Sequence, residues 1–108
     1  MFGHIKFHQH PSLKKGKQAI LDFGEYRMSV VCTPHSYGGD AGLYEVGLFK
    51  NNDMVEIPGI TKSGDTVQGW LEEKDIVLLV EKMCKITKLD IRLVLLRSAF
   101  RDTIEKDK

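Results

Sequence analysis

Apolar and polar residues alternate with a period of two in the first half of the chain, which is the pattern of half-buried β-strands. Ala19, Leu21 and Phe23 alternate in this way with their neighbours, and the same pattern continues over residues 26–32. Gly24 is the first residue of the two-residue connection, where a type II′ turn requires a positive φ. The pattern therefore predicts an antiparallel hairpin centred on Gly24.

Two further strands are predicted beyond the glycine-rich segment 35–42. Residues 43–50 alternate again, and residues 51–53 are Asn-Asn-Asp, residue types that tolerate a positive φ and favour a turn. The chain is then expected to return as a strand over residues 54–57. Together these segments predict a four-stranded antiparallel β-meander.

The second half of the chain predicts an irregular connection followed by a helix. Pro58 and Gly59 interrupt the strand pattern, and residues 60–69 predict a loop, or a short irregular strand, that leads to Trp70. Residues 72–85 predict an α-helix, because apolar residues recur there at i, i+3, i+4 and i+7 and acidic residues occupy the first turn. The recurring apolar residues are Ile76, Leu79, Val80 and Met83.

The C-terminal segment fits two structures. Residues 87–90 supply a capping box for a helix that continues to about Lys106, but the alternation within residues 89–97 also fits a fifth strand. We favour the helix, because a pattern with a 3.6-residue period continues to the end of the segment. Its predicted apolar face consists of Leu93, Leu96, Phe100 and Ile104.

These elements predict an α+β fold, a four-stranded antiparallel meander packed on one face by one or two C-terminal helices. The chain has 108 residues, of which 42% are hydrophobic and 29% charged, and this corresponds to a single globular domain. We place the domain at residues 17–108. Residues 1–16 contain few apolar residues and predict a flexible, basic, histidine-containing leader, with a short strand at residues 5–7 as the alternative.

Neither a membrane span nor a secretion signal is predicted. The longest apolar run, residues 76–80, is far shorter than the roughly 20 residues that cross a bilayer, and residues 1–6 lack the apolar core of a signal peptide. We therefore expect a cytoplasmic protein in which Cys32 and Cys84 are buried free thiols. Because a meander has two edge strands that can pair, the expected states are a monomer or a homodimer.

No metal centre, cofactor or catalytic site is expected. Histidines at positions 4, 8 and 10 have a spacing that can hold zinc, nickel or copper, but the leader has no carboxylate to complete such a centre. His35, Ser36 and Asp40 are the residue types of a nucleophilic triad, yet they lie within a single loop, whereas known triads draw their members from separate elements. We therefore expect a protein that is not an enzyme.

The distribution of charge leaves nucleic-acid binding as a secondary possibility. Residues 1–17 carry four lysines and no acid, while the remaining 12 basic and 15 acidic residues sum to −3. Lys14, Lys15 and Lys17 are weak candidates for contacts with phosphate groups, since so few lysines give only a salt-sensitive attraction. A small nucleic-acid-associated protein is thus the alternative function.

Protein binding is the function that we favour from the residues. A long glycine-rich loop at the end of a sheet is a common place for contact residues, and an exposed leucine on a polar helix face can belong to an interface. Leu78 lies at the centre of the polar face of the predicted helix, where it either contributes to an interface or is covered by the second helix. The candidate contact residues are His35, Tyr37, Gly38, Gly39, Asp40, Trp70 and Leu78.

Three short segments resemble small uncharacterised proteins encoded by bacteriophages and prophages. They are Tyr-Gly-Gly at residues 37–39, Gly-Leu-Tyr-Glu-Val at residues 42–46 and Asp-Thr-Val-Gln-Gly-Trp-Leu at residues 65–71, the last running into an amphipathic helix. The resemblance covers just over half of the chain and transfers no catalytic residue. It implies a phage accessory protein in the bacterial host cytoplasm that binds a host or phage protein, for example a defence nuclease. The histidine-containing leader and the extension beyond Thr87 depart from this pattern.

Overall fold

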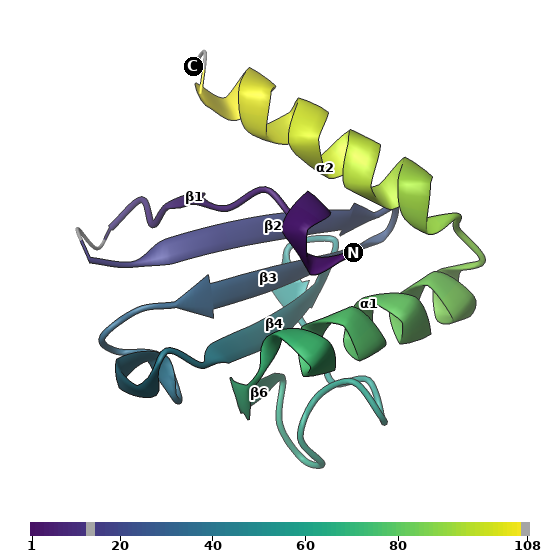
Figure 1. The fold of residues 1–108 in the computed structure, drawn as a ribbon. Coiled ribbons are helices and arrows are strands. Elements are labelled where there is room, and N and C mark those ends of the chain that lie inside the picture. Colours follow the sequence, from purple (N-terminus) through teal and green to yellow (C-terminus); the bar gives the residue numbers. More distant parts are fainter. Residues whose placement is uncertain (13–14, 107–108) are drawn as a thin grey trace.

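The computed structural model describes residues 1–12 and 15–106, with side chains described up to residue 99. These residues form an antiparallel six-stranded sheet and two C-terminal α-helices, which confirms the α+β class (Figure 1). The strands are β1 (His8–Gln9), β2 (Lys17–Phe23), β3 (Tyr26–Cys32), β4 (Tyr44–Lys50), β5 (Asp53–Met54) and β6 (Val67–Leu71). The helices are α1 (Glu73–Thr87) and α2 (Ile91–Lys106), with 3₁₀ turns at Phe2–His4 and Gly39–Ala41. The C-terminal segment is therefore a helix and not a fifth strand.

The central strands β2, β3 and β4 form the predicted meander. Ala19 pairs with Val30, and Val30 pairs with Val46, so the apolar residues of each strand face the same side. Gly24 has a φ of 86°, as the predicted turn requires.

The number of strands differs from the predicted four. The fourth predicted strand, residues 54–57, is reduced to β5, because the chain turns away before Pro58, which has no backbone N–H to donate to a ladder. The segment that we expected to be a loop or an irregular strand contributes β6, which pairs with β4 on the same side as β5. Pairing of Gly47 with Val67 joins segments that lie 20 positions apart, and local alternation gave no sign of it.

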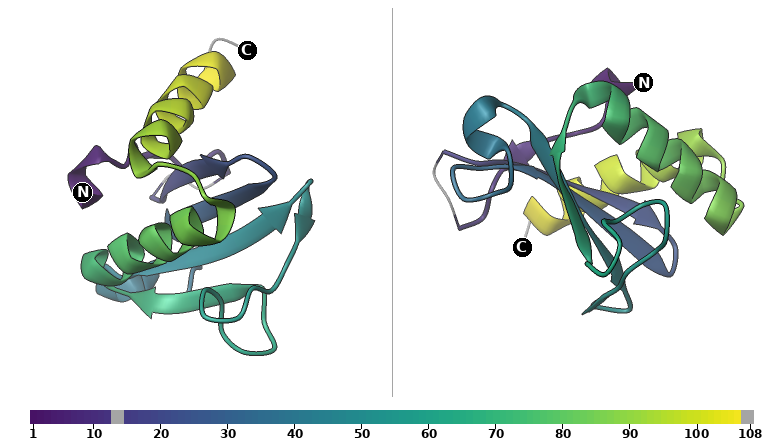
Figure 2. Two further views of the ribbon diagram at one scale, coloured as in Figure 1. Left: turned by 90° about the vertical axis from the view of Figure 1, so that its right-hand side faces the viewer. Right: turned by 90° about the horizontal axis from the view of Figure 1, so that it is seen from below.

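Helix α1 covers one face of the sheet, as predicted. Figure 2 shows α1 lying against one side of the strands. The N–H of Glu72 donates to the Asp75 carboxylate at 2.9 Å and so caps the start of the helix. The residues of α1 that are buried against the sheet are the four predicted ones, Ile76, Leu79, Val80 and Met83.

Helix α2 lies along the edge of β2 beyond the point where β1 ends. The N–H of Asp22 donates to the Ser98 hydroxyl at 3.0 Å, and the Arg97 guanidinium lies 2.7 Å from the Asp22 carboxylate. The predicted apolar face is wrong for Leu93 and Leu96, which are exposed. The buried face is instead Ile91, Val94 and Leu95, of which Val94 is fully buried, so the predicted apolar face was chosen on the wrong side of the helix. The side chains of Phe100 and Ile104 lie outside the described set.

The N-terminal residues pack on the domain, which corrects the expectation of a loose leader. Ile5 is 5% exposed and belongs to the core, and Phe7 packs against it. The short strand lies at His8–Gln9 rather than at residues 5–7, and it pairs with the start of β2. In the part of the chain that the structure describes, no helix combines the length and the apolar character that crossing a membrane requires.

Candidate functional site

Tyr37 and Trp70, which lie far apart in the sequence, meet beside strand β6. The N–H of Trp70 donates to the carbonyl oxygen of Tyr37 at 3.1 Å. Their side chains are 61% and 65% exposed, and both line a surface hollow of about 430 Å³. Lys62, Asp65, Val67, Gln68 and Gly69 complete the lining. We call Tyr37, Trp70 and this hollow the aromatic surface.

Glycines allow the close approach that forms the aromatic surface. A Cβ atom on Gly69 would lie 2.3 Å from the Cβ of Tyr37, and one on Gly39 would lie 1.8 Å from the Thr33 carbonyl oxygen. Both distances are far below van der Waals contact. Gly38 adds a φ of 89°, a conformation that glycine adopts without the penalty of a side chain. Two of the predicted contact residues, Gly38 and Gly39, therefore shape the loop rather than offer side chains to a partner.

A β-bulge directs Trp70 outward. Leu71 pairs with Tyr44 and Gln68 pairs with Val46, so two residues of β6, Gly69 and Trp70, lie opposite the single residue between Tyr44 and Val46. Trp70 has a φ of 59°, which is unfavourable for a residue with a Cβ atom. Such strain persists only where the surrounding structure imposes it, and it is concentrated at functional sites.

Tyr37 is fixed on both sides of its backbone. Its N–H donates to the Glu45 carboxylate at 3.2 Å, while its carbonyl oxygen accepts from Trp70. Glu45 is the β4 residue that faces the bulge, so one side chain connects the loop to the irregular part of the sheet. The sequence contains no local sign of this contact, because it depends on how the loop between β3 and β4 folds back onto β4.

The remaining predicted residues of the loop have different surroundings. His35 and Asp40 are exposed. The Ser36 hydroxyl accepts from the Thr33 N–H at 2.9 Å and lies 3.1 Å from the Thr33 carbonyl oxygen, to which it donates. Ser36 therefore stabilises the turn, and the described contacts do not join it to His35 as a nucleophile is joined to its base.

Leu78 is 55% exposed, and α2 does not cover it. It lines a second hollow, of about 300 Å³, between α1 and the segment around Ile60. Gln68 is among the lining residues of both this hollow and the aromatic surface. Tyr37 and Trp70 are thus in direct backbone contact, whereas Leu78 has only the lining residue Gln68 in common with their hollow.

The candidate basic residues do not form a common surface in the described part of the chain. The Lys17 ammonium group lies 5.0 Å from the ring centroid of Phe7 and 5.2 Å from that of Tyr44, which makes it part of an intramolecular cation–π contact. Lys15 is exposed, and Lys14 lies outside the described residues. Among the side chains of residues 1–12 and 15–99, no three His, Cys, Asp or Glu residues gather as a metal site would need.

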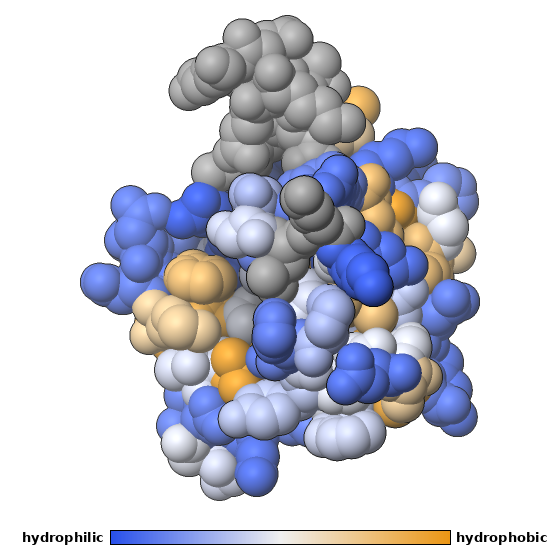
Figure 3. All heavy atoms as spheres, turned by 90° about the vertical axis from the view of Figure 1, so that its left-hand side faces the viewer, coloured by the Kyte–Doolittle hydropathy of each residue, from blue (hydrophilic) through white to orange (hydrophobic). Residues whose placement is uncertain are grey.

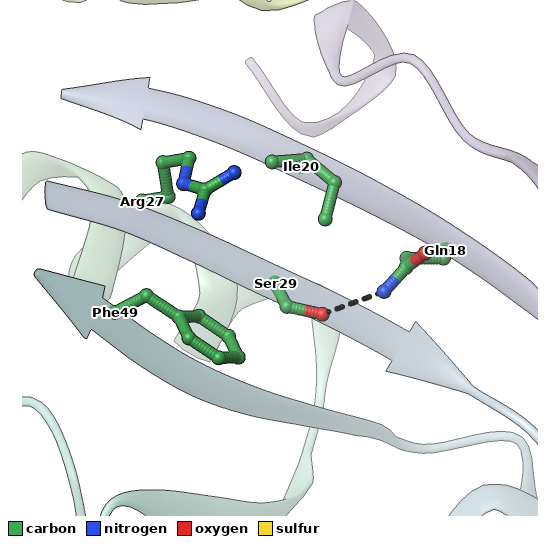
Figure 4. Close-up of a pocket in the computed structure, with 5 residues that line it drawn as sticks. All are labelled: Gln18, Ile20, Arg27, Ser29 and Phe49. Atoms are coloured by element: carbon green, nitrogen blue, oxygen red, sulfur yellow. Dashed lines mark hydrogen bonds between the residues drawn. The ribbon is translucent and has the colours of Figure 1, made fainter. Parts of the chain in front are cut away.

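The face of the sheet opposite α1 carries a small hollow that sequence reasoning missed. Figure 4 shows side chains from β2, β3 and β4 around it, with the Gln18 amide donating to the Ser29 hydroxyl at 3.0 Å. The signal was present in the alternation, since Ile20 and Phe49 are apolar at positions that should be polar on a solvated face. The lining residues are Gln18, Ile20, Arg27, Ser29 and Phe49.

The thiol of Cys84 is not activated. Burial raises the pKa of the Cys84 thiol above its ordinary value, and the nearby carboxylates of Asp90 and Glu81 raise it further. A raised pKa keeps the thiol protonated at neutral pH, whereas a cysteine nucleophile requires the thiolate. Cys84 therefore acts as a packing residue at neutral pH.

Comparison with known proteins adds no relative to these observations. No family model, curated protein or solved structure matches the chain. Figure 3 shows the side of the molecule on which the 35–42 loop lies, where apolar residues form several small groups among hydrophilic ones. On this side of the molecule, the choice of a functional site therefore depends on the geometry of individual side chains and not on one large apolar patch.

Proposed function

We propose that the chain is a non-enzymatic protein-binding module and that the aromatic surface is its contact site. The observation that carries this proposal is Trp70, an exposed tryptophan held at a positive φ by a bulge. Tryptophan and tyrosine are enriched among the residues that dominate the energy of protein interfaces. Burial of such a ring against a partner yields a large apolar contribution that the isolated chain does not obtain.

A structural role does not account for Trp70. A residue whose task is packing is expected to lose most of its exposure, whereas this side chain retains 65%. The unfavourable φ costs on the order of 1 kcal/mol, which the exposed ring does not recover through burial in the chain itself. Contact with a partner supplies the missing compensation.

The setting of the proposal comes from the resemblance to phage and prophage proteins. On this proposal the protein acts in the cytoplasm of a bacterial host, where it occupies a host or phage protein such as a defence nuclease. The alternative, nucleic-acid binding through the N-terminal lysines, has weaker support, because Lys17 is already engaged with aromatic rings. That alternative predicts an affinity for DNA or RNA that falls steeply with salt.

The test is capture of a partner from bacterial lysate with the full chain and matched variants. We expect the wild-type chain to retain a stoichiometric protein, and Trp70→Ala to weaken capture by roughly 2 kcal/mol, as for an interface hot spot. Leu96→Ala, which removes another exposed apolar side chain far along the sequence, should bind as the wild type does.

A second matched pair of variants tests whether the contact site includes the hollow beside Leu78. Leu78→Ala is compared with Leu96→Ala, since both leucines are exposed on helices. Loss of capture in Leu78→Ala alone extends the contact site past Gln68. Normal capture by both Tyr37→Ala and Trp70→Ala, with unchanged melting temperatures, would show that the aromatic surface is not the contact site.

A further inference from the structure

The hollow on the face of the sheet opposite α1 contains a guanidinium group without a carboxylate partner. Figure 4 shows Arg27 and Ser29 on β3, between the side chains of the two neighbouring strands. Arg27 is half-buried, and among the described side chains it bonds only to Asn52, whose amide oxygen accepts from Nη2. Its positive charge is therefore not compensated by an acidic side chain of the described set. We call this site the Arg27 hollow.

The acidic residue nearest to Arg27 in the sheet is engaged elsewhere. Asp22 lies opposite Arg27 in the pairing of β2 with β3. However, the Arg97 guanidinium lies 2.7 Å from the Asp22 carboxylate, and the Gly24 N–H donates to the same carboxylate at 2.8 Å. Among the described residues that line the Arg27 hollow, none is Asp or Glu. Charge complementarity therefore favours an anionic occupant.

Arg27 and Ser29 both offer hydrogen-bond donors to such an anion. Asn52 uses a single N–H of the guanidinium, and the others can donate side by side to the two oxygens of a carboxylate. The Ser29 hydroxyl accepts from the Gln18 amide at 3.0 Å, so its own O–H is available to donate. Because Arg27 and Ser29 are separated by a single residue of β3, their side chains lie on the same face and reach the same hollow.

Apolar walls and a small volume determine what can accompany the anionic group. Ile20 lies opposite Ser29 on β2, and Phe49 lies opposite Arg27 on β4. The hollow has a volume of about 160 Å³. Cavities of about 150 Å³ hold a molecule the size of benzene, so the ligand has about six heavy atoms.

A carboxylate with a short hydrocarbon stem uses both parts of the site, whereas phosphate or sulfate gains nothing from the apolar walls. We propose that the Arg27 hollow binds such a carboxylate, with its oxygens accepting hydrogen bonds from Arg27 and Ser29 and its stem packed between Ile20 and Phe49. The site lies outside the aromatic surface and is independent of the function proposed for it.

The experiment is an NMR titration of the ¹⁵N-labelled full chain with butyrate. We expect butyrate to shift the Arg27 Nε–H signal and the amides of Ser29 and Phe49, with a dissociation constant on the order of 1 mM. Butyramide, which has the same shape but no charge, should bind at least about tenfold more weakly. Acetate, which lacks most of the stem, should bind at least about fourfold more weakly, the effect of one buried CH₂ group.

Matched variants test the two donors separately. Arg27→Met keeps most of the apolar stem and should weaken butyrate binding at least about tenfold, whereas Arg92→Met, which removes the same charge at an exposed position, should bind as the wild type does. Ser29→Ala should weaken binding about tenfold and tests the site even if Arg27→Met does not fold. Trp70→Ala should bind butyrate normally, because Trp70 does not line the Arg27 hollow.

A further arm identifies the source of the carboxylate. A capped Gly-Gly-Glu-Gly-Gly peptide presents the same group as an acidic side chain, and the peptide with glutamine in place of glutamate is its control. Tighter binding of the glutamate peptide than of butyrate assigns the site to a side chain of a partner, and the reverse order assigns it to a free small molecule. Equal affinity for butyrate and butyramide, or unchanged butyrate binding by Ser29→Ala and a folded Arg27→Met, would overturn the inference.

Discussion

Two groups of aromatic residues in this protein have opposite surroundings. Phe2, Phe7 and Tyr44 pack against one another with ring centroids 5.3 to 5.7 Å apart, and Tyr44 is 5% exposed. Tyr37 and Trp70 meet through their backbones, and in the described part of the chain neither ring packs on another ring or carries a cation above it.

The difference separates stability from function. The first group, Phe2, Phe7 and Tyr44, extends the core, and its rings gain burial and dispersion contacts within the chain. The aromatic surface costs stability, since its tryptophan has a strained φ and its rings remain in water. Substitutions in the first group should change the free energy of unfolding, and those in the second should change binding.

The largest expected effect is that of Tyr44→Ala. Removal of this buried ring should lower the free energy of unfolding by about 3–5 kcal/mol, since it deletes contacts with Phe2 and Phe7 and leaves a cavity. Trp70→Ala should lower it by no more than about 0.5 kcal/mol, as for other surface positions. Urea denaturation measures both values, and equal losses would show that the two groups do not differ in role.

An intermediate effect is expected for Gly69→Ala. The new methyl group would meet the Cβ of Tyr37 at 2.3 Å, so the loop must move, at a cost of about 1–3 kcal/mol, and the aromatic surface is deformed. Gly3→Ala is the control, because no atom lies within 4 Å of its Cβ position. Thermal unfolding of the two variants, together with partner capture, is the measurement. A Gly69→Ala variant that matches the wild type in both would disprove the close contact.

A smaller effect tests the strain at Trp70. Trp70→Gly should be more stable than Trp70→Ala by about 1 kcal/mol, because glycine adopts the positive φ without a Cβ penalty. Neither variant has the indole ring, so the difference between them isolates the backbone. Urea denaturation of both variants gives the difference in their free energies of unfolding. A Trp70→Ala variant as stable as Trp70→Gly would indicate that the bulge is not strained.

The smallest effect is expected for Lys17, which lies beside the group formed by Phe2, Phe7 and Tyr44. Lys17→Met keeps most of the apolar stem but removes the ammonium group above Phe7 and Tyr44, with an expected loss of about 0.5–1 kcal/mol. Lys15→Met, at an exposed position, controls for the change in net charge. Chemical denaturation at low salt should resolve the pair, and identical midpoints would remove the cation–π contact from the account.

Local patterns predicted the elements whose partners are close in the sequence. The hairpin at Gly24 and the helix face from Ile76 to Met83 depend on neighbouring residues, and both were correct. The packing of Ile5 and Phe7 on the core was missed, because two alternating apolar residues predict at most a short strand and do not indicate what that strand packs against. Short apolar segments of this kind become ordered only through distant contacts.

Only part of the candidate site could be predicted from the sequence, for the same reason. Its aromatic members stood out as large residues near glycines, so Tyr37 and Trp70 could be chosen from the sequence. Their meeting depends on the pairing of β4 with β6, and the contribution of Glu45 depends on how the loop between β3 and β4 folds back onto β4. No local period encodes such a register, and for this reason Gln68, which lines both hollows, was not among the candidates.

Quenching of Trp70 fluorescence tests the central claim most directly, because the chain contains a single tryptophan. The account predicts emission typical of a water-exposed indole and efficient quenching by acrylamide in the free protein. Addition of the captured partner should then shift the emission to shorter wavelength and protect the ring from the quencher. A ring that is already protected in the free protein, or one that stays fully quenchable in the complex, would contradict the claim that this tryptophan is held exposed for a partner.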